Sequence, residues 1–226
     1  MQTAFTSQTT PRVPLSLRIG FWICIVIAVA VVIRRVVALA HPSQSGPPQM
    51  ANLDAVFASH ASLTLAHIIP AMLFVLLVPL FYFGRFANAA WLKFSLYALG
   101  AIVGFTAYAM STDAVGGWIE RSAVLFFNTF FLYSLVRSFL YFRKSDPILQ
   151  RRWMTRAIVV LLGIATTRPV MGVFFATSPI THLQPNQFFG IAFWIGFSIN
   201  TIVVELWLRR RESQFDPERM ATHPSS

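Results

Sequence analysis

The sequence predicts an all-α protein: a polytopic transmembrane bundle of six helices. The first observation is six apolar stretches of roughly twenty residues, each nearly free of charge. At about 1.5 Å per residue, such a stretch crosses a hydrocarbon core of roughly 30 Å. The second observation is that only 12% of the residues are charged, against about 25% in soluble domains. In lipid, backbone polar groups must be satisfied internally, so these spans are predicted to be helices.

The predicted spans define one membrane domain, residues 19–208, between a cytoplasmic segment 1–18 and a polar cytoplasmic tail 209–226. In order, they are 19–39, 57–83, 91–111, 122–142, 155–177 and 188–208.

Local signals support the individual spans. The second contains Pro70 and Pro79, which a membrane helix tolerates when neighbouring groups satisfy the freed carbonyls. The third carries Gly100 and Gly104, a spacing that lets two helices approach closely. The fifth follows the strongly basic segment 143–156, which we expect to be a loop.

The positive residues orient the bundle. Thirteen of the 18 lysines and arginines lie in alternate segments that include both termini, and only three lie in the other segments. Because cytoplasmic loops carry the excess of Lys and Arg, both termini are predicted to be cytoplasmic. We expect a multi-pass protein of the bacterial inner membrane, with anionic lipids as partners on its cytoplasmic side. Nucleic acid is not expected as a partner, since the cations flank spans.

The first span has an alternative interpretation. Its apolar core, 19–33, is short and follows a basic start, and Ala38-Leu39-Ala40 has the form of a signal-peptidase site. However, Arg34 and Arg35 lie between the core and that site, which is unfavourable for cleavage. We favour an uncleaved span whose two arginines reach toward the outer surface.

Two ionisable side chains, His67 and Arg168, are predicted at the same depth. Each lies roughly 14–16 Å from the outer end of its span, counted by helix rise, and Thr167 adds a hydroxyl beside Arg168. His60 shares a helix face with His67 but lies nearer the outer surface. Either these groups are satisfied interior side chains, or they line a polar site for an anionic or carbonyl-bearing ligand such as a quinone or lipid head group.

Arg137 and Glu205 form a second candidate pair, because both lie a few residues from the inner ends of their spans. We expect a structural ion pair between these two helices. The alternative is a local pair of Glu205 with Arg209, which is four residues further on.

No metal site and no cofactor are predicted. The only histidines within the spans, His60 and His67, lie on one helix, whereas haem held by two histidines of one chain needs two helices. A haem site therefore remains a weak alternative.

The residues 143–168 resemble a known family. Gln150-Arg151-Arg152-Trp153-Met154-Thr155-Arg156, followed by Thr167-Arg168, is similar to the domain-of-unknown-function family 2306 of bacterial membrane proteins. That family carries His-Arg-x-Trp-Met-x-Arg before a late span, and His67 resembles its earlier span histidine. The resemblance covers about residues 60–175 and implies a helical membrane protein without an established reaction.

This chain departs from the family at the motif histidine, which is Gln150 here; Trp91-Leu92-Lys93 replaces a second His-Arg. Arg151, Arg152, Trp153 and Arg156 are then interpreted as an interfacial anchor.

For function, we expect a non-enzymatic membrane protein that binds a small molecule, a lipid or a membrane-protein partner near His67 and Arg168. A haem- or quinone-associated redox protein and a small transporter are the alternatives.

Overall fold

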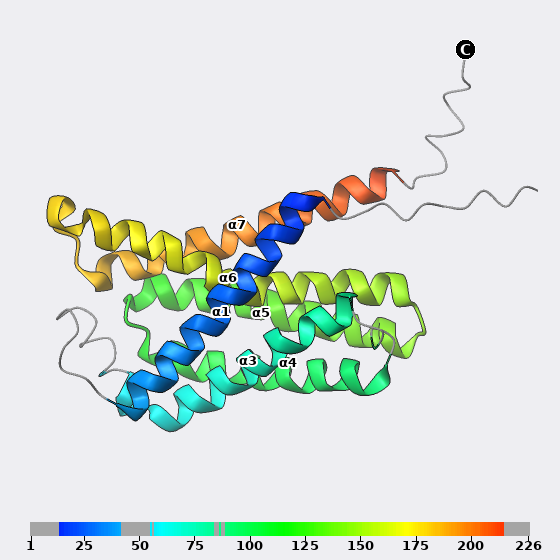
Figure 1. Ribbon diagram of the computed structural model, residues 1–226, viewed down its shortest axis with the longest axis horizontal. Coiled ribbons are helices and arrows are strands. Elements are labelled where there is room, and N and C mark those ends of the chain that lie inside the picture. Colours follow the sequence, from blue (N-terminus) through cyan, green and yellow to red (C-terminus); the bar gives the residue numbers. More distant parts are fainter. Residues whose placement is uncertain (1–13, 42–54, 56, 84–85, 87–88, 215–226) are drawn as a thin grey trace, which may run out of the picture.

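The computed structural model describes residues 14–41, 55, 57–83, 86 and 89–214, without the side chains of 211–214. Its helices are α1 (Leu15–Ala40), α3 (Ala61–Phe83), α4 (Ala90–Met110), α5 (Gly117–Arg143), α6 (Pro147–Thr181) and α7 (Pro185–Gln214), with a 3-10 turn η1 (Ser111–Asp113) (Figure 1). No strand occurs among these residues, which confirms the all-α prediction.

Six of these helices are long and apolar enough to cross a membrane. The protein is therefore an integral, multi-pass membrane protein, as the hydropathy pattern predicts. Each predicted span falls largely within one observed helix.

Helix α6 corrects the predicted boundaries, because it begins at Pro147 and contains residues 147–156 of the basic segment 143–156, which we expected to be a loop. Asp146 caps its start: one carboxylate oxygen accepts hydrogen bonds from the backbone N–H groups of Ile148 and Leu149, at 3.1 and 3.0 Å. Pro147 occupies the first turn, where its missing N–H costs no hydrogen bond. With 35 residues, α6 is about 52 Å long by helix rise, so its basic first turns extend beyond the hydrocarbon core.

The helices pack as antiparallel neighbours. Helix α6 lies against α5 and α7, and α3 lies against α4. We call the end of the bundle where α3 and α5 end, and where α4 and α6 begin, the basic end. In Figure 1 this end is on the right, where α1 begins.

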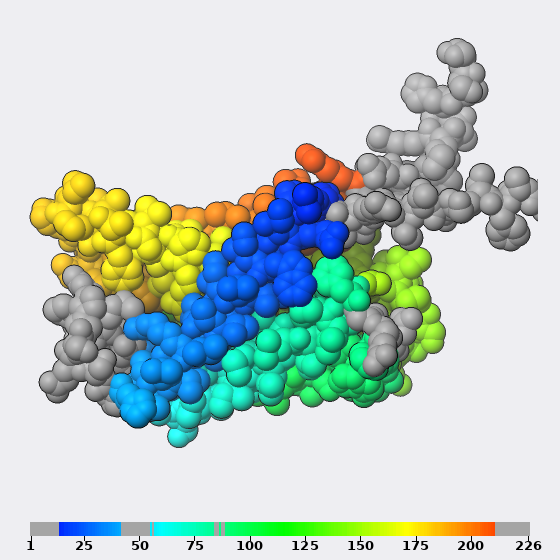
Figure 2. Space-filling view, in the orientation of Figure 1, coloured from blue at the N-terminus to red at the C-terminus, as the bar shows by residue number. Residues whose placement is uncertain are grey.

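Helix α1 runs diagonally across the outside of the bundle, between α3 on one side and α6 and α7 on the other (Figures 1 and 2). It contacts both α3 and α6, whose backbones approach each other closely at few residues; the direct contacts of α3 with α6 include the hydrogen bond between Tyr82 and Thr155 near the basic end. Of its side chains, only Ile25 and Ala28 are fully buried. Helix α1 thus covers a gap between two helices of the bundle.

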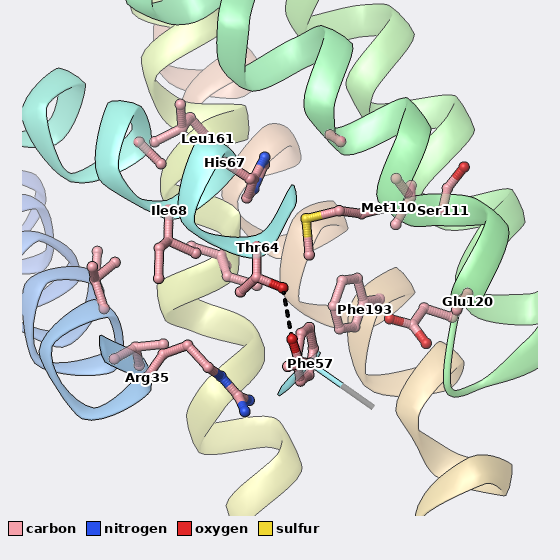
Figure 3. A pocket seen from close by; sticks show the side chains of 18 of the residues that line it. Arg35, Phe57, Thr64, His67, Ile68, Met110, Ser111, Glu120, Leu161 and Phe193 are labelled. Atoms are coloured by element: carbon pink, nitrogen blue, oxygen red, sulfur yellow. Dashed lines mark hydrogen bonds between the residues drawn. The ribbon is translucent and has the colours of Figure 1, made fainter. Parts of the chain in front are cut away.

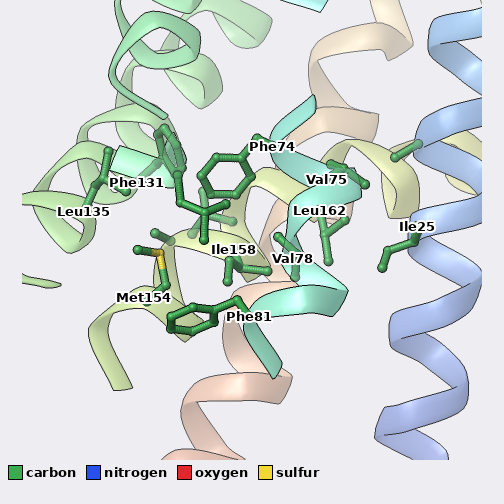
Figure 4. Close-up of a cluster of buried hydrophobic side chains, with 14 of the residues drawn as sticks. Ile25, Phe74, Val75, Val78, Phe81, Phe131, Leu135, Met154, Ile158 and Leu162 are labelled. Carbon is green, nitrogen blue, oxygen red and sulfur yellow. The ribbon is translucent and has the colours of Figure 1, made fainter. Parts of the chain in front are cut away.

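The main hydrophobic core joins α3, α5 and α6 around Phe74, Phe131, Met154 and Ile158, with Ile25 of α1 at its edge (Figure 4). A smaller cluster around Met171 and Phe188 holds the other ends of α6 and α7 together. The two clusters leave room between them for a cavity.

Glycines allow the closest helix contacts. A Cβ atom at Gly100 or Gly104 of α4 would overlap Leu135 or Leu132 of α5, which confirms the predicted close approach of a helix at these residues. Gly196 of α7 lies against the backbone and hydroxyl of Thr167 in the same way.

Candidate functional site

A cavity of about 200 Å³ lies under α1, toward the end of the bundle opposite the basic end. Figure 3 shows its side chains converging from several helices, among them Arg35 of α1, Thr64 and His67 of α3, and Glu120 of α5. Arg168 of α6 lines the same cavity. The structure therefore brings His67 and Arg168, predicted at one depth, into one site.

Arg168 has few protein partners for a buried cation. Its Nη1 atom lies 3.6 Å from the thioether sulfur of Met171, a weak acceptor. Its Nε atom is buried and has no hydrogen-bond partner in the part of the chain that the structure describes. Because a guanidinium has five N–H donors in a fixed fork, Arg168 keeps donors that the described residues do not satisfy, and it lines the cavity.

His67 is held in place through one ring nitrogen. Its Nδ1 atom lies 2.9 Å from the hydroxyl of Thr106 in α4. That hydroxyl lies 2.7 Å from the carbonyl of Ile102 and 3.0 Å from that of Val103, and it donates its only proton to these carbonyls. The hydroxyl then accepts a hydrogen bond from Nδ1–H, so neutral His67 carries a lone pair on Nε2. His67 can accept a hydrogen bond from a ligand or, when protonated, donate one.

Glu120 also lines the cavity, although it was not among the site residues predicted from the sequence. Its carboxylate accepts a 2.6 Å hydrogen bond from the backbone N–H of Gly116, and the residue is buried. The span was predicted to begin at 122, but α5 begins at Gly117, so Glu120 is in the helix. Gly117, the first residue of α5, has a positive φ of 59°, which glycine adopts without strain, and the chain turns there into the helix.

Charges of both signs act at the cavity. Arg34 and Arg35 of α1 and Glu120 of α5 lie within electrostatic range of Arg168. No ion pair joins Arg168 to Glu120 in the described residues, although both line the cavity. The guanidinium carbon of Arg35 lies 3.9 Å from the ring centre of Phe57, and Asp113 is half exposed at the cavity end.

The two other predicted intramembrane polar residues lie outside the lining. Thr167 is fully buried in the contact between α6 and α7, and its hydroxyl donates to the carbonyl of Gly163 at 3.0 Å. His60 is exposed, and its Nε2 atom lies 4.0 Å from a carboxylate oxygen of Asp113. The position of Thr167 favours a structural role, and His60 belongs to the rim.

The predicted pair of Arg137 with Glu205 is wrong. Glu205 binds Arg156 through two hydrogen bonds of 2.9 and 3.1 Å and also accepts one from Arg209 at 3.3 Å. Arg137 instead donates to the hydroxyl of Tyr141 at 2.8 Å. Helix α6 contacts both α5 and α7, and its Arg156, rather than Arg137 of α5, reaches Glu205.

The predicted interfacial anchor therefore also joins helices. The ring of Trp153 lies 5.1 Å from the guanidinium of Arg137 and 4.5 Å from that of Arg156, in cation–π range of both. Arg151 donates to the carbonyl of Tyr82 at 3.2 Å, at the last turn of α3. Arg152 lies within electrostatic range of Arg156 and Glu205.

Gln150 makes buried contacts with two neighbouring helices. Its side-chain amide donates to the hydroxyl of Tyr97 at 3.1 Å, and its backbone carbonyl accepts from Ser138 at 3.0 Å. Tyr97 and Ser138 are themselves 3.1 Å apart. These buried contacts hold α4, α5 and α6 together at the basic end.

Within the described residues, no three His, Cys, Asp or Glu side chains gather closely enough to hold a metal ion. Comparisons with protein-family models, with curated proteins and with solved structures found no match to this chain. The resemblance to the domain-of-unknown-function family 2306 stays a prediction.

Proposed function

We propose that this integral membrane protein binds a small molecule through an anionic or carbonyl oxygen, in the cavity between His67 and Arg168. The observation that carries the proposal is the buried Nε of Arg168, which has no described partner. A buried donor without an acceptor costs about 1–3 kcal/mol. A ligand oxygen that reaches the guanidinium would remove that cost, since a guanidinium binds carboxylate or phosphate in a bidentate manner.

The other lining groups support a ligand of this kind. His67 lines the cavity about one turn of α3 from Thr64. As an acceptor, its Nε2 atom would contact a hydroxyl of the ligand, while Arg168 holds the anionic or carbonyl oxygen. Apolar side chains make up most of the rest of the lining, including Ile68, Met110 and Phe193. A largely apolar cavity with a few convergent polar groups is typical of small-molecule sites.

The experiment uses benzoate as a compact anionic probe. The full-length protein is reconstituted in nanodiscs of zwitterionic lipid, and saturation transfer from protein to benzoate is measured by NMR, with empty nanodiscs subtracted. Transfer is expected for the wild type and to fall at least tenfold in Arg168→Gln, the loss expected for a charge-assisted hydrogen bond. Arg121→Gln is the matched control, because Arg121 is exposed on α5 and stacks at 5.9 Å on Trp118 outside the cavity.

Equal transfer to benzoate in the wild type and in Arg168→Gln would contradict the proposal. A folded Arg168→Lys variant guards against misfolding as the explanation, since it keeps the positive charge but loses the fork. Intermediate transfer in Arg168→Lys supports a direct contact with the anion.

We further propose that the protein lies in a bacterial inner membrane with its basic end in the cytoplasm. Arg151 and Lys144 lie at this end, and cytoplasmic anionic lipids attract such cations. The cavity then opens toward the outer leaflet.

A further inference from the structure

We infer that the ligand is a single-chain anionic amphiphile, bound with its carboxylate or phosphate head at Arg168 and its alkyl chain directed toward the basic end. This inference rests on the proposed function and names the ligand class of the same site. It follows from the way in which polarity changes along the cavity.

The cavity lining is divided into a charged part and an apolar part. Toward the basic end, lining residues run from Arg35 to Ala28 on α1, from His67 to Val75 on α3 and from Arg168 to Leu161 on α6. Beyond the ionisable residue that starts each of these runs, every lining residue is apolar; the polar Thr64 lies on the other side of His67. Seven or eight residues correspond to about 10–12 Å of helix. The cavity thus has a charged head region and an apolar shaft of about that length.

The shaft is separated from lipid by a single helix. The backbones of α3 and α6 approach each other closely at few residues, and α1 contacts both helices. Figure 2 shows α1 lying on the surface between them. Few of its side chains are buried, so α1 makes a thin wall between the apolar shaft and the bilayer. A molecule that already resides in the membrane has the shortest path to such a shaft.

The charged region favours an anionic head over a neutral or cationic one. Arg168 has the unpartnered buried donor, and Arg34 and Arg35 add positive potential to it. Glu120 and Asp113 also line the cavity and oppose this potential, but Glu120 accepts a hydrogen bond from the backbone N–H of Gly116 and Asp113 is half exposed. A phosphate or carboxylate would accept two hydrogen bonds from the guanidinium of Arg168. An alkyl ammonium would be repelled by its positive charge.

The experiment compares octyl phosphate with three matched probes: methyl phosphate, octanol and octyltrimethylammonium. Binding to wild-type protein in zwitterionic nanodiscs is measured by equilibrium titration, with empty nanodiscs subtracted. Octyl phosphate is expected to bind, and each other probe to bind at least tenfold more weakly. Ala71→Phe fills the shaft, because Ala71 lines it. Ala66→Phe is the control on the same helix, since Ala66 is exposed and outside the lining.

The outcomes separate the two proposals. Loss of octyl phosphate binding in Ala71→Phe but not in Ala66→Phe, with benzoate still bound by both, supports the amphiphile. If methyl phosphate binds as tightly as octyl phosphate, or Ala71→Phe has no effect, the inference is overturned while the anion site stands. If octanol or octyltrimethylammonium binds as well as octyl phosphate, the inference that the ligand has an anionic head is overturned. If Arg168→Gln changes neither benzoate nor octyl phosphate binding, the proposed function fails as well.

Discussion

The arginines of this protein differ in whether the protein itself supplies them with acceptors. At the basic end, Arg156 binds the carboxylate of Glu205, and Arg151 donates to the backbone carbonyl of Tyr82 at the end of α3. Arg168 has only a thioether as a described hydrogen-bond partner. Charges buried in a bundle are costly unless they are paired, so a cation that lacks a strong acceptor is the residue from which a ligand site is best inferred.

The ion pair of Arg156 with Glu205 is expected to contribute about 1–2 kcal/mol of coupling energy, because the side chains are 11% and 29% exposed and joined by two hydrogen bonds. A double-mutant cycle of Arg156→Gln and Glu205→Gln measures it, with the free energy of unfolding taken from reversible denaturation in detergent. The matched cycle of Arg137→Gln with Glu205→Gln should give less than about 0.5 kcal/mol. Stronger coupling to Arg137 than to Arg156 would contradict the structure.

At the element scale, the sequence predicted which segments are helices better than where they begin. Hydropathy marks the part of a helix that lies in lipid, and α6 continues past it because Asp146 and Pro147 start the helix in water. The same limit hid Glu120, two residues outside the predicted span. His67 and Arg168 could be matched by counting residues, since helix rise is constant. The partner of Glu205 could not be predicted in this way, because the depth of a residue does not say which helices are neighbours.

The contact between α6 and α7 is expected to depend on Gly196. A Cβ atom there would lie 2.6 Å from the backbone nitrogen of Thr167 and 2.7 Å from its Cα. Backbone cannot move aside as a flexible side chain can, so Gly196→Ala should destabilise the protein by about 1–3 kcal/mol. Gly172→Ala on α6, where a Cβ atom meets nothing within 4 Å, should be neutral or slightly stabilising. Similar melting temperatures for the two variants in detergent would argue against this helix contact.

At the scale of the whole molecule, the arrangement follows from six apolar helices with cations concentrated at one end. We predict that both termini are cytoplasmic. Green fluorescent protein fused after residue 226 should fluoresce in the bacterial host, and alkaline phosphatase fused at the same position should be inactive. A fusion after His41, at the opposite end of α1, should give the reverse pattern. Active phosphatase at the C-terminus would show that the bundle has the opposite orientation, with the cavity nearer the cytoplasm.

The proposed site requires a ligand whose anionic group accepts hydrogen bonds from the guanidinium of Arg168 inside the bundle. The most direct measurement is an experimental structure of the full-length protein in nanodiscs with octyl phosphate. We predict density for a phosphate within hydrogen-bond distance of Arg168, continuing as a chain between α1, α3 and α6. A cavity that holds only water, with Arg168 turned to form a direct ion pair with Glu120, would contradict the account.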